Sequence, residues 1–222
     1  MCLFSVAIDG PAGAGKSTIA RRVAERLGLI YVDTGALYRT VGLAMSRAGT
    51  DLVSPQAVDA LLKRIHVELA FQNGEQRVLL DGEDVSEAIR MPEASMMASR
   101  CSALPAVRAY LLDLQRNMAK TRSVVMDGRD IGTVVLPGAD IKIFLTASAE
   151  VRARRRYNEL RAKGQDVTYA QVLDDMQKRD YNDTHRAAAP LKQAEDAVLL
   201  LTDTLDLDQA VAAVLKIIGE RR

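Results

Sequence analysis

The chain has 222 residues, which is long enough for one sizeable core or for one core that carries a small inserted lobe. Hydrophobic residues make up 48% of it and charged residues 27%, which excludes a disordered chain, and its apolar runs are far shorter than a membrane-spanning helix needs. The net charge of +1 and the aromatic content of 4% argue against a nucleic-acid partner, so any basic site must be local.

The N-terminal apolar run at 3–9 predicts a buried strand followed by a turn. It has no basic leader and no small-residue cleavage site, so we expect a cytoplasmic protein without a signal peptide. Cys2 and Cys101 lack the spacing of metal ligands, and we interpret both as reduced thiols outside any site.

A glycine-rich loop with the sequence GPAGAGKS follows this strand at 10–17. It matches G-x-x-x-x-G-K-[ST], in which backbone N–H groups surround phosphate oxygens, the lysine reaches the β- and γ-phosphates, and the hydroxyl binds Mg²⁺. Chance matches occur in glycine-rich turns, but apolar residues at helical spacing over 17–27 supply the expected helix. Ser17 is therefore the expected Mg²⁺ ligand. The residues expected to bind ATP are Gly10, Pro11, Ala12, Gly13, Ala14, Gly15, Lys16, Ser17 and Thr18.

The alternation of strands and helices continues beyond the loop. We expect a strand at 29–32, a helix at 36–48 and another helix that starts at Ser54. Tyr38 and Arg39 lie in the first of these helices, where they would offer a ring face and a bidentate phosphate clamp to a second substrate. The alternative is a capped helix with a surface Tyr-Arg pair.

The hydrophobic period then changes from 3.6 to 2. Apolar residues alternate with polar ones over 67–71, and the dipeptide Asn-Gly at 73–74 predicts a tight hairpin turn before a returning strand. Antiparallel strands are foreign to a parallel α/β core. We therefore interpret 66–104 as an insertion into a core formed by 1–65 and 105–222.

The remaining sequence predicts further elements of the core. Thr168 with Gln171, and Asp206 with Gln209, form capping boxes at the starts of two helices. The other elements expected are a helix at 105–119, strands at 124–127 and 141–145, an arginine-dense helix at 151–163 and a last strand at 197–201. The fold class expected is thus α/β: a three-layer P-loop fold with about five parallel strands, a small β-containing insert and an arginine-rich lid.

The strand at 124–127 delivers a carboxylate to the sheet edge at which open α/β folds bind ligands. Asp127 would hold the metal ion there through water. An ordinary turn aspartate before Gly128 is the alternative. The adjoining Arg129 and Asp130 favour a site, because a charge pair at a ligand edge is an unusual place for mere solubility.

Two groups of arginines are candidates for phosphate contacts. Arg179, Asp183 and Arg186 share one helical face, which is either an exposed ion-pair ladder or a reader of phosphate and base edge. Arginines at 152, 154, 155 and 156 crowd one helix, as a solvated basic face or as a lid at about 151–166 that closes over the transferring group. The residues expected to act in catalysis are Lys16, Asp127, Arg129, Arg152 and Arg155.

Five segments of the chain resemble bacterial cytidylate kinases, over about 8–191. They are IDGPAGAGKST at 8–18, DTGALYR at 33–39, LDGEDVSEAIR at 80–90, DGRDIGTVV at 127–135 and RDYNDTHRAAAPL at 179–191. The resemblance implies a monomer with an adenylate-kinase-like core and an enlarged insert that binds the monophosphate, and a Mg²⁺-dependent reaction in which ATP phosphorylates CMP or dCMP. The implied contacts with the monophosphate are Thr34, Tyr38, Arg39, Ser99, Arg108, Arg129, Asp130, Arg179, Asp183 and Arg186.

Other functions fit parts of the same pattern. A kinase for another monophosphate, UMP or AMP, would use the same chemistry, in which the attacking group is the substrate's own phosphate oxygen. A GTPase-type switch would need a guanine-reading N-K-x-D segment, which the sequence lacks. A nucleic-acid-associated NTPase would use the arginine-rich helix as its partner surface, but the balanced net charge argues against it.

Overall fold

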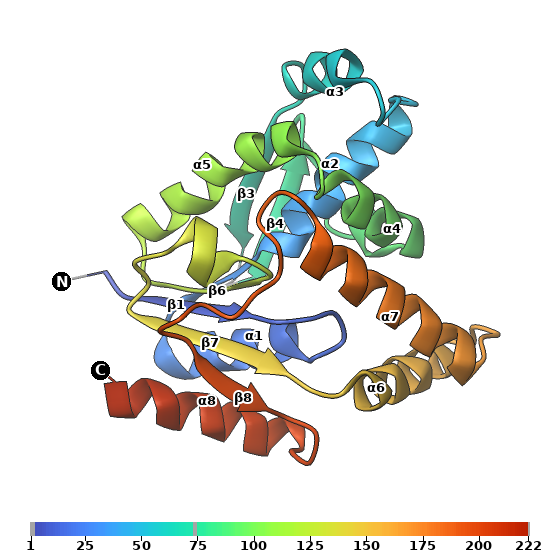
Figure 1. Cartoon of the computed structure of the whole chain (residues 1–222). Coiled ribbons are helices and arrows are strands. Elements are labelled where there is room, and N and C mark those ends of the chain that lie inside the picture. Colours follow the sequence, from blue (N-terminus) through green and yellow to red (C-terminus); the bar gives the residue numbers. More distant parts are fainter. Residues whose placement is uncertain (1–2, 73–74, 222) are drawn as a thin grey trace.

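The centre of the fold is a five-stranded parallel sheet (Figure 1). In the computed structural model, which describes residues 3–72 and 75–221, the strands lie in the order β2-β6-β1-β7-β8. They are β1 (Ser5–Asp9), β2 (Ile30–Asp33), β6 (Val124–Gly128), β7 (Ile141–Thr146) and β8 (Val198–Leu201). Asp9 pairs with Gly128, and Asp33 pairs with Asp127. The carboxyl ends of β1, β2 and β6 therefore meet at one edge of the sheet.

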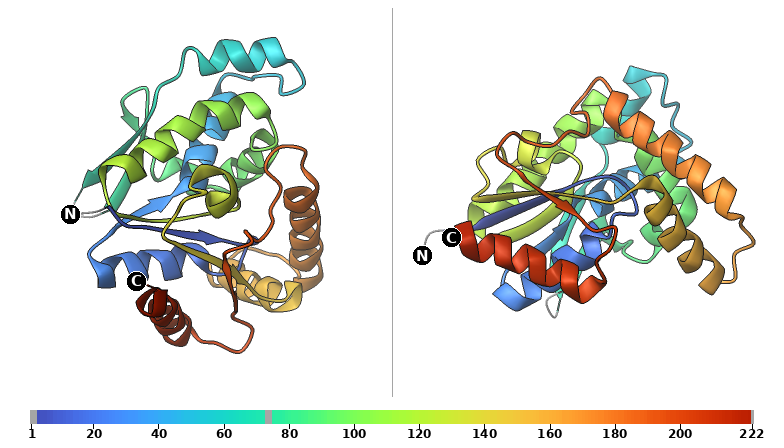
Figure 2. Two further views of the ribbon diagram at one scale, coloured as in Figure 1. Left: turned by 60° about the vertical axis from the view of Figure 1, so that its left-hand side comes forward. Right: turned by 60° about the horizontal axis from the view of Figure 1, so that its bottom comes forward.

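Helices cover both faces of this sheet (Figure 2). Helices α1 (Lys16–Leu27) and α8 (Leu207–Arg221) share an apolar cluster with one face, and α5 (Pro105–Thr121) packs on the other with the short π-helical turn η2 (Ile131–Val135). Because β1 and β6 are buried on both faces, their sequences, SVAID and VVMDG, are nearly continuous apolar runs. The predicted three-layer α/β fold is thus confirmed. Among the described residues, no helix is both long enough and apolar enough to cross a membrane.

The structure also contains a small antiparallel sheet. Its strands are β3 (Val67–Gln72), β4 (Glu75–Leu80) and β5 (Glu83–Asp84). The predicted alternation is confirmed, because Val67 pairs with Leu80 and Leu69 pairs with Val78, which places these apolar side chains in register. The tight turn predicted at 73–74 lies outside the described residues, as does Cys2.

The small sheet shares its apolar core with helices that flank it in the sequence. Helices α2 (Thr34–Arg47) and α3 (Pro55–Leu62) and the first half of α5 contribute buried residues to this cluster, among them Leu37, Met45 and Leu111. The turn η1 (Ala88–Arg90) and helix α4 (Pro92–Cys101) complete the region. The sequence did not predict α4, because no side chain caps its start and its apolar residues are mostly alanine and methionine.

Helices α6 (Ala149–Ala162) and α7 (Tyr169–His185) form a pair beside the sheet (Figures 1 and 2). They pack around an apolar cluster that includes Ala153. The predicted capping box at the start of α7 is confirmed: the N–H of Gln171 donates to Oγ1 of Thr168 at 3.2 Å, and the N–H of Thr168 donates to Oε1 of Gln171 at 2.9 Å. Asp206 and Gln209 make the same exchange before α8.

Candidate active site

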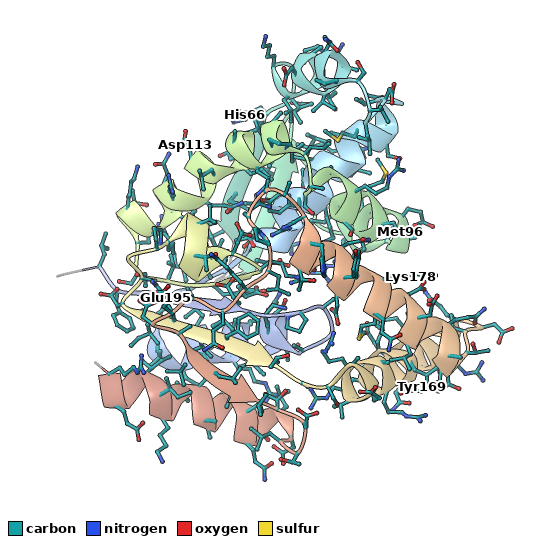
Figure 3. The ribbon with its side chains drawn as sticks, in the orientation of Figure 1. His66, Met96, Asp113, Tyr169, Lys178 and Glu195 are labelled. Atoms are coloured by element: carbon teal, nitrogen blue, oxygen red, sulfur yellow. The ribbon has the colours of Figure 1, made fainter. Side chains whose placement is uncertain are left out.

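A cavity of about 690 Å³ opens at the carboxyl edge of the central sheet. Its walls come from the phosphate loop and α1, from α2 and α4, from the residues after β6, and from α6 and α7. Figure 3 labels Met96, which lines the cavity from α4, and Lys178 on α7, where the next residue, Arg179, lines it. The cavity therefore joins segments that lie far apart in the sequence.

Most of the residues predicted from the sequence line this one cavity. From the phosphate loop and the start of α1 these are Ala12, Gly13, Gly15, Lys16, Ser17 and Thr18. Asp127 lines it, as does every residue with a predicted monophosphate contact: Thr34, Tyr38, Arg39, Ser99, Arg108, Arg129, Asp130, Arg179, Asp183 and Arg186. Within the described part of the chain, the predicted residues that do not line it are Gly10, Pro11, Ala14, Arg152 and Arg155.

The phosphate loop turns sharply between β1 and α1. At its start a Cβ atom on Gly10 would lie 1.9 Å from the carbonyl oxygen of Leu145, so only glycine fits there. At its end Gly15 has a φ of 87°, and no side chain of the described residues caps α1. The first N–H groups of the helix thus face the cavity with the positive end of the helix dipole, an arrangement suited to phosphate.

Lys16 is buried at the base of the loop. Its Nζ donates to the carbonyl oxygen of Pro11 at 2.7 Å, so the backbone of the loop itself holds the side chain. Burial lowers the pKa of Lys16, and the positive charge of Arg129 lowers it further. A polyphosphate in the cavity would oppose both effects and favour the charged ammonium group.

Asp127 connects the phosphate loop to the sheet. Its Oδ2 accepts the hydroxyl of Ser17 at 2.9 Å, and its Oδ1 accepts the hydroxyl of Tyr31 at 2.8 Å. Burial raises the pKa of Asp127, and the charge of Asp33 raises it further. The carboxylate is therefore positioned by two hydroxyl groups in a site where a cation would stabilise its charged form.

Hydrogen bonds from the DTGALYR segment at 33–39 hold the start of α2 against the end of β6. Oδ1 of Asp33 accepts the N–H of Ala36 at 3.0 Å and so caps α2, while its Oδ2 accepts Nη2 of Arg39 at 2.7 Å. The hydroxyl of Thr34 donates to the carbonyl oxygen of Asp127 at 2.7 Å. These contacts hold the guanidinium group of Arg39 at the cavity wall.

Arginines and aspartates interlock beyond the end of β6. One carboxylate oxygen of Asp130 accepts a hydrogen bond from Arg108, and the other accepts one from Nη2 of Arg186 at 3.3 Å. The next arginine, Arg129, donates through Nε to Oδ2 of Asp183 at 2.8 Å. Burial raises the pKa of Asp130, and its arginine partners oppose that shift. Three arginines from different elements thus converge around two aspartates.

Arg179 is the least satisfied of these cations. Its Nε is buried and has no hydrogen-bond partner among the residues that the structure describes. Burial lowers the pKa of Arg179, and the charge of Arg129 adds to the effect. Elsewhere in the same cavity, the guanidinium group of Arg108 lies 5.6 Å from the centre of the Tyr38 ring. An anion in the cavity would supply the hydrogen bonds that Arg179 lacks.

Arg152 reaches the backbone of the phosphate loop. Its Nη1 donates to the carbonyl oxygen of Ala12 at 2.9 Å, its Nε donates to that of Ala147 at 2.8 Å, and its Nη2 lies 2.6 Å from Oδ2 of Asp180. Its side chain is buried among these partners. Arg152 therefore ties α6 and α7 to the loop, and its guanidinium group does not line the cavity.

Arg155 and Arg156, on the same helix, face in different directions. Arg155 donates to the carbonyl oxygen of Thr202 at 2.5 Å and so binds the end of β8. Arg156 lines the cavity and pairs with Glu159 at 2.7 Å. Of these three arginines, Arg156 has access to a ligand in the cavity.

Several residues at the site were not singled out from the sequence. Tyr31 lay inside a predicted strand and in no motif, and Asp9 lay in the segment IDGPAGAGKST at 8–18 but had no role assigned to it. Asp180 lay between two predicted site residues, and Met96 lay in a helix that was not predicted. A polar residue at the carboxyl end of a buried parallel strand was the available signal for Asp9.

Comparisons with known proteins agree with this geometry. A sequence model of the cytidylate kinase family matches residues 6–220. A cytidylate kinase from Syntrophotalea carbinolica is 48% identical over 217 residues, which cover 98% of this chain and 92% of the relative. Another from Caldicellulosiruptor bescii is 48% identical and covers 96% and 95%. The crystal structure of an uncharacterized protein from Eubacterium ventriosum has the same fold, with a TM-score of 0.54 and 14% identity over 98% of this chain and 99% of that one. The chain belongs to the cytidylate kinase family.

Proposed function

We propose that this chain transfers the γ-phosphoryl group of ATP to CMP or dCMP and releases ADP with CDP or dCDP. One observation carries the proposal: a single cavity is lined by the phosphate loop and by the arginine–aspartate cluster around Asp130. Two anionic substrates must meet in such a space, and membership of the cytidylate kinase family supports the same reaction. A GTPase switch would have no use for the second half of the cavity.

The donor side of the site is the phosphate loop. Its backbone N–H groups and the start of α1 bind the triphosphate, and Lys16 contacts the β- and γ-phosphates. Positioning and charge stabilisation are what phosphoryl transfer demands of a protein, so no nucleophilic side chain is required. The attacking atom is a phosphate oxygen of the acceptor.

The acceptor side is built from five of the arginines that line the cavity. We assign its phosphate to Arg39, Arg108, Arg129, Arg179 and Arg186. Asp130 and Asp183 have carboxylate oxygens that accept hydrogen bonds from the sugar hydroxyls or the cytosine amino group, which uracil lacks. Thr34, Tyr38 and Ser99 complete the predicted contacts.

Mg²⁺ fits the oxygen donors at the loop. Ser17 and Asp127 offer a hydroxyl and a carboxylate that lie 2.9 Å apart, and Mg²⁺ typically takes one or two protein oxygens together with phosphates and waters. Burial and the charge of Asp33 raise the pKa of the Asp127 carboxyl, a shift that a bound cation would oppose. When bound, the ion would neutralise charge on the β- and γ-phosphates. In this proposal Ser17 ligates it directly and Asp127 holds it through water.

The basic helix α6 would close the site over the donor. Arg156 is placed to approach the transferring group, because it lines the cavity. In this proposal Arg152 and Arg155 support catalysis indirectly. Arg152 binds the carbonyl oxygen of Ala12 and Arg155 binds that of Thr202, and both bonds attach α6 to the core. In the proposed domain division, 66–104 forms the monophosphate-binding insert, 1–65 and 105–222 form the core, and the lid spans about 151–166.

We place the enzyme in the cytoplasm, the compartment that holds both ATP and nucleoside monophosphates. We take a monomer as its working form, because one chain lines the donor and acceptor parts of the cavity. Nucleic acid and membrane have no place in the reaction.

Initial rates with CMP, dCMP, UMP and AMP as acceptors test the assignment. We expect kcat/KM to be highest for CMP or dCMP in the presence of ATP and Mg²⁺. A preference for AMP or UMP would assign the acceptor to another nucleotide. Guanine nucleotide binding without turnover of any monophosphate would overturn the kinase assignment itself.

A further inference from the structure

Asp9 is a buried carboxylate that the reaction described above does not use. It ends β1 directly before Gly10, the first residue of the phosphate loop, and the residue is 5% exposed. Its Oδ1 accepts the N–H of Ile131 at 2.7 Å, and its Oδ2 accepts the N–H of Gly132 at 2.7 Å. Both oxygens are therefore committed to the backbone of another segment.

These two bonds begin where the pairing of the sheet ends. Strands β1 and β6 run in parallel register up to the pair Asp9↔Gly128. Beyond that pair the chain leaves the ladder and passes through Arg129 and Asp130 before it enters η2. The carboxylate of Asp9 thus replaces the ladder as the connection between the two segments.

The peptide unit between Asp130 and Ile131 is held on both sides. The carbonyl oxygen of Asp130 accepts the N–H groups of Val134 at 2.9 Å and Val135 at 3.1 Å. The N–H groups of Ile131 and Gly132 donate to Asp9. Because this backbone is fixed, the side chain of Asp130 leaves it in one direction, toward Arg108 and Arg186.

Packing leaves little freedom at the same point. A Cβ atom on Gly132 would lie 3.1 Å from Cδ of Lys142 and 3.4 Å from Oδ2 of Asp9. Burial raises the pKa of Asp9 to about 6, and the bonds from Gly132 and Ile131 act in the opposite direction. Each oxygen of the buried Asp9 carboxylate thus has one backbone N–H as its hydrogen-bond partner, in closely packed surroundings.

We infer that Asp9 is a positioning residue that locks the loop bearing Arg129 and Asp130 onto the strand bearing the phosphate loop, and so fixes the acceptor phosphate in line with the donor. The inference rests on the proposed phosphoryl transfer. It predicts that Asp9 affects the use of the acceptor more than the binding of the donor.

The first test compares Asp9→Asn with Asp140→Asn. Asp140 is a matched control, because its Oδ2 accepts the N–H of Ser5 at 2.7 Å at the opposite end of the same strand, in an exposed position. An asparagine at position 9 keeps the shape of the side chain but sets an NH2 group against one of the two amides. We expect Asp9→Asn to lower kcat/KM for CMP by about 10- to 100-fold, as for a misplaced reacting group, with the Kd for ATP close to wild type.

Two results would overturn the inference. One is a kcat/KM for CMP in Asp9→Asn equal to that in Asp140→Asn. The other is a parallel loss of CMP use and ATP affinity, which would place the effect of Asp9 on the phosphate loop alone. If Asp9→Asn does not fold, Asp9→Glu, which keeps the carboxylate but displaces its oxygens from the two amides, is judged by the same two criteria.

A double-mutant cycle separates positioning from a general loss of stability. If Asp9 acts through Asp130, its replacement should have a much smaller effect on kcat/KM for CMP in an Asp130→Asn background. Additive effects would contradict the inference. Hydrogen exchange of the Ile131 and Gly132 amides should accelerate in Asp9→Asn and stay slow in Asp140→Asn.

These outcomes are distinguishable from a failure of the proposed function. Should wild-type protein prefer another monophosphate, the same comparison is made with that acceptor, since the contacts of Asp9 do not depend on the base. Should the wild type turn over no monophosphate, the proposed function fails, and the exchange experiment still decides whether Asp9 orders the loop.

Discussion

Ser17 and Asp127 lie 110 residues apart in the sequence, yet the hydroxyl of Ser17 donates to Oδ2 of Asp127 at 2.9 Å. This contact joins the first turn of α1 to the end of β6. Tyr31 occupies the other carboxylate oxygen at 2.8 Å, so the group has a fixed orientation. The pair brings together the two oxygen donors assigned to Mg²⁺.

Replacement of Asp127 by asparagine should weaken the binding of Mg²⁺. We expect the Mg²⁺ concentration for half-maximal activity to rise by about 10- to 100-fold, the usual cost of disturbing a metal site. Asp140→Asn is the control. An unchanged Mg²⁺ titration would exclude Asp127 from the metal site.

The same variant carries a pH signature in its thermal unfolding. Burial raises the pKa of Asp127 in the folded state, so its contribution to stability is present below its ordinary pKa of about 4 and is lost as the pH rises through the raised value. The Tm of Asp127→Asn relative to wild type should therefore be higher at pH 8 than at pH 4. The opposite trend would mean that the folded site favours the charged carboxylate.

Lys16 should take up a proton when ATP binds. Burial and Arg129 lower the pKa of Lys16 in the free protein, and the phosphates restore it. At pH 8 the terminal phosphate, with a pKa of about 6, is already ionised and contributes little. Calorimetric titration without Mg²⁺ in two buffers of different ionisation enthalpy should show net proton uptake and an affinity that falls as pH rises.

Lys16→Arg provides the control for that measurement, because arginine stays charged throughout the range. Proton uptake should disappear in this variant even if its affinity for ATP is reduced. Uptake equal to that of the wild type would assign the proton to another group.

Removal of Arg179 should weaken acceptor use without weakening the fold. Arg179→Ala removes a half-buried cation whose buried Nε has no hydrogen-bond partner among the described residues, so the free energy of unfolding should not decrease. The same change should lower kcat/KM for CMP by about 100-fold, which corresponds to the loss of one charged contact worth about 3 kcal/mol. Arg22→Ala, at an exposed arginine paired with Asp208, is the control. A loss of ATP affinity alone would place Arg179 on the donor side.

Loss of Arg152 should lower the stability of the fold, whereas loss of Arg156 should lower kcat. Arg152→Ala breaks a buried hydrogen bond to Ala12 and a part-buried ion pair with Asp180, and we expect it to lower the free energy of unfolding by about 1–3 kcal/mol. Arg156→Ala removes an exposed ion pair worth less than about 1 kcal/mol and should lower kcat with little change in Tm. Chemical denaturation and initial rates on both variants make the comparison. A lower kcat for Arg152→Ala with unchanged stability would return Arg152 to the reacting centre.

The fold could be predicted from sequence wherever the signal is local. The phosphate loop has a strand before it and a helix after it, and the period-2 pattern of Val67 and Leu69 is a property of neighbouring residues. Helix α4 escaped prediction, because it starts without a capping side chain and its placement depends on packing against α2. Helix propensity alone could not have oriented it.

The site was predictable as a set of residues but not as a set of contacts. The positions of Arg108 and Arg186 were expected at the acceptor, yet their shared partner Asp130 depends on how α5 and α7 meet beyond β6. Arg152 and Arg156 are indistinguishable by composition on one basic helix. Rotation about the helix axis sends one toward the backbone of Ala12 and the other into the cavity, and that rotation is set by tertiary packing.

The transfer itself is tested most directly by following the label of [γ-³²P]ATP in the presence of CMP and Mg²⁺. The account predicts that the label appears in CDP in amounts equal to the ADP formed, with little inorganic phosphate. Release of the label as inorganic phosphate at a rate that CMP does not affect would contradict it, because that result describes an NTPase rather than a two-substrate kinase.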